Sequence, residues 1–403
     1  MCICAGWNTA KEMSGEIHMS ELQRHRMTFK LLAPVISVFA KLKFNYEYDD
    51  LGKIEGPYLL LANHNLELDP ALVGVAVGKQ LYFVASEHIL RKGLGTWFLM
   101  TFFKPIIHMK GKQGMQTVKQ MLKTLKEGSS VCLFPEGNRS FNGLTGEILP
   151  SIGKVAQCSG VKLVTYRIEG GYLTQPRWSL TLRRGKLKGR LIHVYSVEEL
   201  KKMTGKQISE AICRDLYEDA YETQKRERIA YKGKNLALGL ESTIFVCPAC
   251  GRISTLHSQG SHLFCDCGFD AVYDVYGELT DQAENKYTVT ELDRMQQEKL
   301  KQLLEAGEGV GSPLFTDKVT LCEIDGEHNL VGIREGKLTA YGDRLECCGQ
   351  VFPYSEMQGM AIYSRNAMIL HINGHKGHFE IKADQAFNAL KYLYLYQTKE
   401  KVK

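Results

Sequence analysis

The first half of the chain alternates short apolar runs with segments whose apolar residues recur every three or four positions. The runs predict strands at 58–62, 80–85, 130–134 and 161–168, and the periodic segments predict helices at 21–42, 115–128 and 205–228. Strands that alternate with helices favour a parallel sheet with helices packed on its faces. We therefore expect an α/β fold with a mainly parallel sheet and flanking helices.

The pattern changes near residue 240. Cysteine, glycine and β-forming residues are frequent in 241–275, and a polar helix is predicted at 290–309, with Thr290 as its N-cap and Gly307 as its stop. From Leu314 onward, short alternating stretches separated by glycine turns predict a small β-sheet or barrel, closed by a helix at 385–397. We expect four parts: an α/β domain at 1–235, a small cysteine-rich unit at 240–275, a linker helix at 286–309 and a small β module with a C-terminal helix at 312–403.

Composition and charge narrow the classes of protein that the chain can be. The 403 residues are 44% hydrophobic and 24% charged, which predicts folded domains and more than one of them. A net charge of +6 is too mild to indicate nucleic-acid binding, which we do not expect. No secretory signal is recognised at the N-terminus, and the apolar stretch 31–42 is shorter than the ~20 residues of a membrane span. These features predict a cytoplasmic protein with reduced cysteines.

A histidine and an aspartate follow the apolar run in LLANHNLELDP, residues 60–70. Only four residues separate His64 from Asp69, so the two side chains can meet only if the chain turns sharply after the strand. A histidine held by a carboxylate can act as a general base. The same pair can also be a polar contact with a purely structural role, and both readings stay open at this point.

A second polar block, LFPEGNRS at residues 133–140, also follows a predicted strand. An arginine and a serine beside a glycine turn are suited to an anion, because the guanidinium grips a phosphate with two bonds while hydroxyl and N–H groups complete the site. Ligands of open α/β sheets bind at the carboxyl ends of the strands, so both blocks could open on one cleft. The alternative is an ordinary loop with a surface arginine.

Together, the two blocks resemble the glycerolipid acyltransferase family, which includes lysophosphatidic acid acyltransferases. NHNLELD is similar to the family's H-x-x-x-x-D block, and FPEGNRS is similar to its FPEGTRS block, with Asn138 in place of threonine. The resemblance spans roughly residues 30–200, about half of the chain.

The resemblance implies transfer of a fatty acyl group from acyl-CoA or acyl carrier protein to 1-acylglycerol 3-phosphate, which gives phosphatidic acid. His64 would be the general base and Asp69 would orient it, with no catalytic metal. The acceptor would be bound by residues of the second block and by Lys110, which stands where the family usually has arginine: Lys110, Glu136, Gly137, Arg139 and Ser140. The alternatives are another acceptor, such as glycerol 3-phosphate or another lysolipid, and a non-catalytic lipid-binding scaffold with the same fold.

Four cysteines lie in two tight turns, CPACG at 247–251 and CDCG at 265–268. Two thiolates from each turn would give the tetrahedral sulfur coordination of a closed, structural zinc site, as in a zinc ribbon. We therefore expect zinc bound by Cys247, Cys250, Cys265 and Cys267. A thiol redox role is the alternative, because C-x-x-C also occurs in oxidoreductases.

The remaining expectations concern surfaces. The segment 314–403 resembles a pleckstrin-homology-like module, which could bind lipid or a partner or serve only to pack. Apolar stretches at 31–44 and 95–103, with Trp97 as an anchor, could lie in a membrane interface, and the basic run 183–190 could meet anionic headgroups. The alternative places the apolar stretches in the core and the basic run in a solvated hairpin. We expect peripheral contact with the inner face of the membrane.

Overall fold

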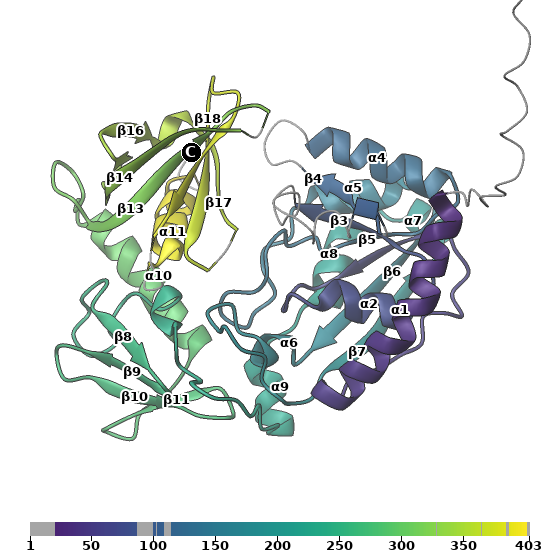
Figure 1. Ribbon diagram of the computed structural model, residues 1–403, viewed down its shortest axis with the longest axis horizontal. Coiled ribbons are helices and arrows are strands. Elements are labelled where there is room, and N and C mark those ends of the chain that lie inside the picture. The colour runs from purple at the N-terminus through teal and green to yellow at the C-terminus, as the bar shows by residue number, and fades with distance from the viewer. Residues whose placement is uncertain are drawn as a thin grey trace, which may run out of the picture.

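The structure is a computed structural model that describes residues 21–86, 100–101, 103–108, 114–327, 329–363, 365–383 and 387–400. Three sheets lie in sequence order along the chain, and Figure 1 shows each as a separate part of the molecule. Among the residues that the structure describes, no helix has an apolar stretch long enough to cross a bilayer.

The first sheet has seven strands in the order β1-β7-β6-β2-β5-β3-β4. All neighbouring strands in it are parallel except β6 and β7, so the prediction of a mainly parallel sheet is confirmed. Its strands are β1 (Glu47–Tyr48), β2 (Tyr58–Ala62), β3 (Tyr82–Ser86), β4 (Ile106–His108), β5 (Val131–Leu133), β6 (Lys162–Glu169) and β7 (Lys188–Tyr195).

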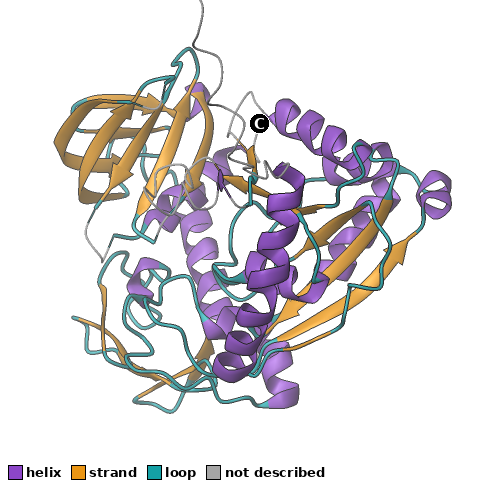
Figure 2. Cartoon of the chain, turned by 45° about the vertical axis from the view of Figure 1, so that its right-hand side comes forward, coloured by secondary structure: helices purple, strands orange, loops and turns teal. Residues whose placement is uncertain are grey.

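Helices cover both faces of the first sheet, and the alternation of side chains along β2 explains why. Leu60 and Ala62 belong to the core shared with α1 and α2, whereas Leu59 and Leu61 belong to the core on the other side. Figure 2 shows the two helical layers with the twisted sheet between them. The helices of this part are α1 (Glu21–Phe44), α2 (Asp69–Val77), α4 (Gly114–Lys126), α5 (Ser151–Cys158), α6 (Gly171–Thr174), α7 (Val197–Lys202), α8 (Gly205–Leu216) and α9 (Ala220–Glu227).

The single helix predicted at 205–228 is wrong, because the chain breaks between α8 and α9. Tyr217 has an extended backbone, with φ −62° and ψ 123°, and Asp219 begins α9 by accepting hydrogen bonds from two backbone N–H groups of its first turn. The backbone N–H of Glu218 donates to Thr145 Oγ1 at 2.8 Å. This break turns the Glu218 side chain into the interior, where the candidate site uses it.

The second sheet is antiparallel, in the order β12-β11-β10-β9-β8. Its core is shared with the first part of the chain, since Leu263 and Ala271 pack in one cluster with Tyr172 and Trp178. The elements are the short 3-10 helix η2 (Leu240–Ser242) and the strands β8 (Leu256–Gln259), β9 (His262–Cys265), β10 (Asp270–Tyr273), β11 (Glu278–Asp281) and β12 (Lys286–Thr288).

Helix α10 (Val289–Glu305) joins the second sheet to the third. The predicted N-cap, Thr290, is wrong. Thr288 begins the helix and forms a reciprocal capping box with Glu291, while the Thr290 hydroxyl donates to the Asn142 carbonyl at 2.7 Å.

The third sheet is also antiparallel, in the order β16-β15-β14-β13-β19-β18-β17, and Figure 2 shows it curling around its own core. Helix α11 closes this core, so the predicted C-terminal sheet with a closing helix is confirmed. The elements are β13 (Phe315–Ile324), β14 (Leu330–Ala340), β15 (Arg344–Cys347), β16 (Gln350–Pro353), η3 (Tyr354–Glu356), β17 (Met357–Ile362), β18 (Ala367–Ile372), β19 (His378–Lys382) and α11 (Ala389–Glu400). The boundaries of the four expected parts, and the likeness to a pleckstrin-homology module, stay predictions.

Candidate active site

The two polar blocks emerge side by side at one edge of the first sheet. Strands β2 and β5 are parallel neighbours, and Leu61 pairs with Leu133 in their register. The chain therefore leaves both strands at the same level. Two hydrogen bonds then join the loops: the Glu136 carboxylate accepts the His64 N–H at 2.6 Å, and the Ser140 N–H donates to the His64 carbonyl at 2.9 Å.

His64 is held by Asp69 and by an aromatic ring. Its Nδ1 lies 2.8 Å from Asp69 Oδ2, and its ring stacks on Phe134 with centroids 4.6 Å apart. The Asp69 side chain is fully buried at the start of α2, and its Oδ2 also accepts the N–H groups of Asn65 and Leu66. An Nδ1–H donated to a carboxylate leaves the lone pair on Nε2. His64 keeps 23% of its side chain exposed, so a reacting group can approach this basic nitrogen.

Glu136 and Gly137 shape the second loop. Both Glu136 oxygens are occupied, one by the His64 N–H and the other by the Gly146 N–H. Burial raises the pKa of Glu136 to about 8, although both backbone bonds act in the opposite direction. Gly137 has φ +68°, a conformation that favours glycine. These contacts describe a residue that ties two loops together, and direct binding of substrate by Glu136 or Gly137 stays a prediction.

Ser140 lies beneath the surface of the same loop, with 3% of its surface exposed. Its hydroxyl donates to the Leu144 carbonyl at 2.7 Å and accepts the Gly143 N–H at 2.9 Å. The single hydroxyl hydrogen is therefore already used within the loop, and a bond from it to a phosphate stays a prediction.

Arg139 is the cation of the second block. Its side chain is 17% exposed, its Nη2 lies 3.3 Å from the exposed Glu67 carboxylate, and its buried Nη1 has no hydrogen-bond partner in the structure. Burial is the main cause that lowers the pKa of Arg139. A half-satisfied, largely desolvated guanidinium on the loop that is bonded to His64 is suited to an anionic ligand. The other expected cation, Lys110, lies outside the described residues.

A buried acid, Glu218, supports the histidine loop from inside the fold, and no motif in the sequence predicts it. Glu218 is 4% exposed and accepts hydrogen bonds from the side-chain amides of Asn63 and Asn65 and from the Gly170 N–H. The same two amides also donate to the Ile168 carbonyl at the end of β6. Burial is the largest cause that raises the pKa of Glu218 to about 8. This network fixes the backbone on both sides of His64.

The four predicted cysteine ligands come together from the turn that precedes β8 and from the end of β9 with the turn that follows it. All four Sγ atoms lie within 4.8 Å of one another, with 3.7 Å between Cys247 and Cys267 and 3.9 Å between Cys250 and Cys265. A tetrahedral site with zinc–sulfur bonds of about 2.3 Å has sulfur atoms about 3.8 Å apart, whereas a disulfide needs about 2.05 Å. A hydrogen bond from Arg252 lowers the pKa of Cys250 to about 6. The donor set therefore fits a zinc ion.

Comparisons with known proteins agree with the geometry of the first part. Residues 43–169 match the model of the family described as Acyltransferase. The chain is similar to a chloroplastic 1-acyl-sn-glycerol-3-phosphate acyltransferase of Arabidopsis thaliana, with 29% identity over 148 residues, 36% of this chain and 41% of that protein. A protein of Mycoplasma pneumoniae, described as a probable 1-acyl-sn-glycerol-3-phosphate acyltransferase, is 30% identical over 117 residues, 28% of this chain and 44% of that protein.

The chain thus spans less than half the length of the curated relatives that it matches. A solved structure of the 1-acyl-sn-glycerophosphate acyltransferase PlsC from Thermotoga maritima shares 19% identity and a TM-score of 0.41, covering 49% of this chain and 81% of that one. The residues that match the family model contain both polar blocks. The second and third sheets lie outside the matched residues.

Proposed function

We propose that the protein transfers a fatty acyl group from acyl-CoA or acyl carrier protein to the hydroxyl of 1-acylglycerol 3-phosphate. The observation that carries this proposal is the 2.8 Å contact of His64 Nδ1 with the buried Asp69, in a loop bonded to the block that carries Arg139. The family match and the two similar acyltransferases support the same reaction class.

The proposed reaction needs one base and no covalent enzyme intermediate. His64 Nε2 takes the proton of the acceptor hydroxyl while that oxygen attacks the thioester carbonyl. The tetrahedral intermediate then expels the thiolate, which receives the proton back from the imidazolium. Asp69 holds the productive tautomer and stabilises the imidazolium between the two proton transfers.

Arg139 would bind the phosphate of the acceptor. Its unpartnered Nη1 supports this role, because an anion there would replace the hydrogen bonds lost on burial. Lys110, Glu136, Gly137 and Ser140 remain candidate acceptor-binding residues. An acceptor other than lysophosphatidic acid would use the same base, but its headgroup would make different contacts with Arg139.

The test compares lysophosphatidic acid with a neutral-headgroup lysolipid, in wild type and in Arg139→Ala, with products identified by mass spectrometry. We expect wild type to prefer the phosphorylated acceptor and Arg139→Ala to lose that preference, while its KM for the thioester stays nearly unchanged. Arg190→Ala, which removes a partly exposed arginine paired with Asp49, is the control and should behave as wild type. An equal loss of activity on both acceptors in Arg139→Ala would refute the phosphate role. If wild type formed no product with any acceptor, the scaffold alternative would be favoured.

We also propose that one structural zinc ion is bound by Cys247, Cys250, Cys265 and Cys267. The sulfur separations and the absence of a sulfur pair at disulfide distance among these four residues support it. Zinc would cross-link the turn that precedes β8 to the turn that follows β9.

We also propose that the protein contacts the membrane surface, and the surface of α1 supports this contact. Five apolar side chains spaced three or four residues apart form an exposed stripe along this helix, with exposures between 46% and 73%: Met27, Leu31, Val35, Val38 and Leu42. Such a stripe, with lysines near the end of the helix, suits the interface of an anionic membrane. Trp97 and most of the stretch 95–103 lie outside the described residues.

The basic run 183–190 supports membrane contact less well. Arg183 is buried, and three other basic side chains of the run pair with acids: Lys186 with Glu47, Lys188 with Glu227, and Arg190 with Asp49. Paired charges attract anionic headgroups weakly, so α1 is the better candidate for the contact.

A further inference from the structure

Arg177 is a buried arginine that adjoins the candidate acceptor site, just after α6. It is 8% exposed, and its Nη1 donates to the Arg139 carbonyl at 3.2 Å. Its guanidinium carbon lies 4.2 Å from the centre of the Phe141 ring, two residues beyond Arg139. Arg177 therefore supports the loop on which Arg139 is mounted.

The charge of Arg177 is only partly offset, by the attraction of Glu67, which pairs with Arg139. In the part of the chain that the structure describes, its hydrogen bonds go to the carbonyls of Arg139 and Ile362, and no carboxylate forms an ion pair with it. Burial, and secondly the nearby Arg139, lower the pKa of Arg177 to about 9. Two desolvated guanidinium groups that repel each other are stabilised when an anion binds beside them.

The third sheet contacts this loop directly. Arg177 Nη2 donates to the Ile362 carbonyl at the end of β17 at 3.2 Å, and Arg365 Nη1 donates to the Trp178 carbonyl at 2.8 Å. Phe141 packs against the core of the third sheet. The guanidinium of Arg177 thus connects the Arg139 loop to a sheet that begins more than 170 residues later.

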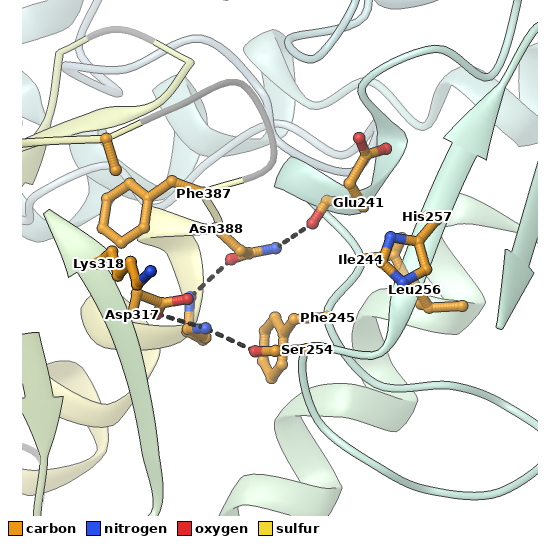
Figure 3. Close-up of a pocket in the computed structure, with 12 residues that line it drawn as sticks. Glu241, Ile244, Phe245, Ser254, Leu256, His257, Asp317, Lys318, Phe387 and Asn388 are labelled. Atoms are coloured by element: carbon orange, nitrogen blue, oxygen red, sulfur yellow. Dashed lines mark hydrogen bonds and ion pairs between the residues drawn. The ribbon is translucent and has the colours of Figure 1, made fainter. Parts of the chain in front are cut away.

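The third sheet is itself fixed to the second part of the chain, as Figure 3 shows. Lys391 of α11 is 1% exposed and contacts Asp317 at 2.7 Å and Ser254 Oγ at 2.6 Å. Asn388 donates to the Glu241 carbonyl at 2.9 Å. These contacts border a cavity of about 220 Å³ between the two parts. The sheet can therefore hold the Ile362 carbonyl in a fixed place for Arg177.

We propose that Arg177 is a positioning residue for the acceptor's phosphate. By donating to the Arg139 carbonyl, it orients Arg139 toward the phosphate, and it adds a second positive charge to the site. The third sheet, which holds Arg177 through the Ile362 carbonyl, is then a structural part of this site. The inference rests on the proposed function and deepens it. It gives the C-terminal module a role in acceptor binding that does not require a separate lipid ligand.

The experiment compares Arg177→Met with Arg183→Met in the full-length protein. Arg183 is a matched control, because it is also a buried arginine and its guanidinium donates to the Leu236 carbonyl and the Tyr273 hydroxyl rather than to the Arg139 loop. Steady-state kinetics with lysophosphatidic acid, and inhibition by inorganic phosphate, are measured for both variants, and circular dichroism checks their folding.

For Arg177→Met we expect the KM for lysophosphatidic acid and the inhibition constant for inorganic phosphate to rise about tenfold or more, with kcat and the KM of the thioester nearly unchanged. Arg183→Met should lose stability without these changes. Arg177→Lys keeps the charge but cannot bond both carbonyls with a planar fork, so its KM and inhibition constant should lie between those of wild type and Arg177→Met. If Arg177→Met does not fold, Arg177→Lys takes its place in the test.

Equal KM values for wild type and a folded Arg177 variant, or the same rise in both Met variants, would overturn the role of Arg177. Failure of the proposed function looks different, because wild type itself would then acylate no lysolipid. In that case calorimetry with inorganic phosphate still tests Arg177, since wild type should bind phosphate about tenfold more tightly than Arg177→Met. No phosphate binding by wild type would refute the anion site.

Discussion

Three carboxylates have different roles around His64: Asp69 and Glu218 are buried, and Glu136 is partly exposed. Asp69 contacts the imidazole directly, Glu136 binds the backbone N–H of His64, and Glu218 binds the amides of the asparagines on either side. Only the first can act on the tautomer and charge of the ring. The other two fix the backbone, so their loss should change the position of the base rather than its chemistry.

Replacing His64 tests the base itself. His64→Ala should lower kcat by about 100-fold or more without unfolding the protein, which is the usual scale for a lost general base. His193→Ala, at an exposed position on β7, is the control and should keep wild-type activity. Turnover is measured by product formation at saturating acceptor, and a His64→Ala variant that works at the wild-type rate would exclude this assignment.

Glu218 predicts a pH dependence of stability. Burial raises its pKa from 4.5 to about 8, so folding favours the neutral acid. Its stabilising contribution is complete below pH 4.5 and is lost as the pH rises through 8, at about 1.4 kcal/mol for each pH unit between these values. The free energy of unfolding of wild type, relative to Glu218→Gln, should therefore fall between pH 5 and pH 8.

Urea denaturation at pH 5, 6.5 and 8 measures this difference. Glu210→Gln on α8, where the side chain is 64% exposed, is the control and should differ from wild type by a constant amount. A constant difference for Glu218→Gln as well would show that Glu218 ionises in the folded protein as it does in the unfolded chain.

Some of these residues are predictable from the sequence and others are not, for a physical reason. His64 and Asp69 are five positions apart, so a turn after a strand is enough to bring them together. Glu218 lies 155 positions from Asn63 and Arg177 lies 38 positions from Arg139, and their contacts depend on how whole elements pack. A pattern of polar and apolar residues contains no information on such distances.

At the scale of helices and strands, the predictable elements are those with a continuous apolar run or with apolar residues at a regular helical spacing. Strand β2 covers the predicted residues 58–62, because five consecutive apolar residues are typical of a strand buried on both faces. The break between α8 and α9 and the start of α10 are not predictable from the pattern, since each depends on a few local hydrogen bonds. At the break, the Glu218 N–H donates to Thr145 and Asp219 caps α9, and at the start of α10 Thr288 and Glu291 form the capping box. Several residues within one helical turn can serve as the cap, so the pattern alone does not fix which residue begins the helix.

The two cysteine turns predict bound metal. Purified protein should contain one zinc per chain by elemental analysis, and Cys250→Ser should contain less, while Cys158→Ser, at an exposed cysteine outside the cluster, should still contain one. Because the second sheet shares its core with Tyr172 and Trp178, removing the metal should raise hydrogen exchange in 247–251 and 265–268 first. Metal-free protein with unchanged exchange in both turns would revive the redox alternative.

On the scale of the whole molecule, the exposed stripe of α1 lies on the outer side of the first sheet. Figure 1 shows α1 at the edge of the molecule farthest from the second and third sheets, and its opposite side packs on α2 through buried residues that include Phe29 and Phe44. A helix that buries one side in the core and exposes a second apolar stripe can contact a bilayer without unfolding. The candidate site on the first sheet could then receive its lipid substrate from that surface.

The double substitution Leu31→Gln with Leu42→Gln tests this orientation. The two side chains are 67% and 73% exposed, so the fold should tolerate the change, while the loss of two inserted leucines should weaken binding to anionic vesicles by at least tenfold. Ile333→Gln on β14, at a residue 60% exposed, is the matched control and should bind as wild type does. Vesicle flotation gives the bound fraction, and activity on a short-chain acceptor dissolved below its micelle concentration should be unchanged. Equal binding by wild type and the double variant would show that α1 is not the contact with the membrane.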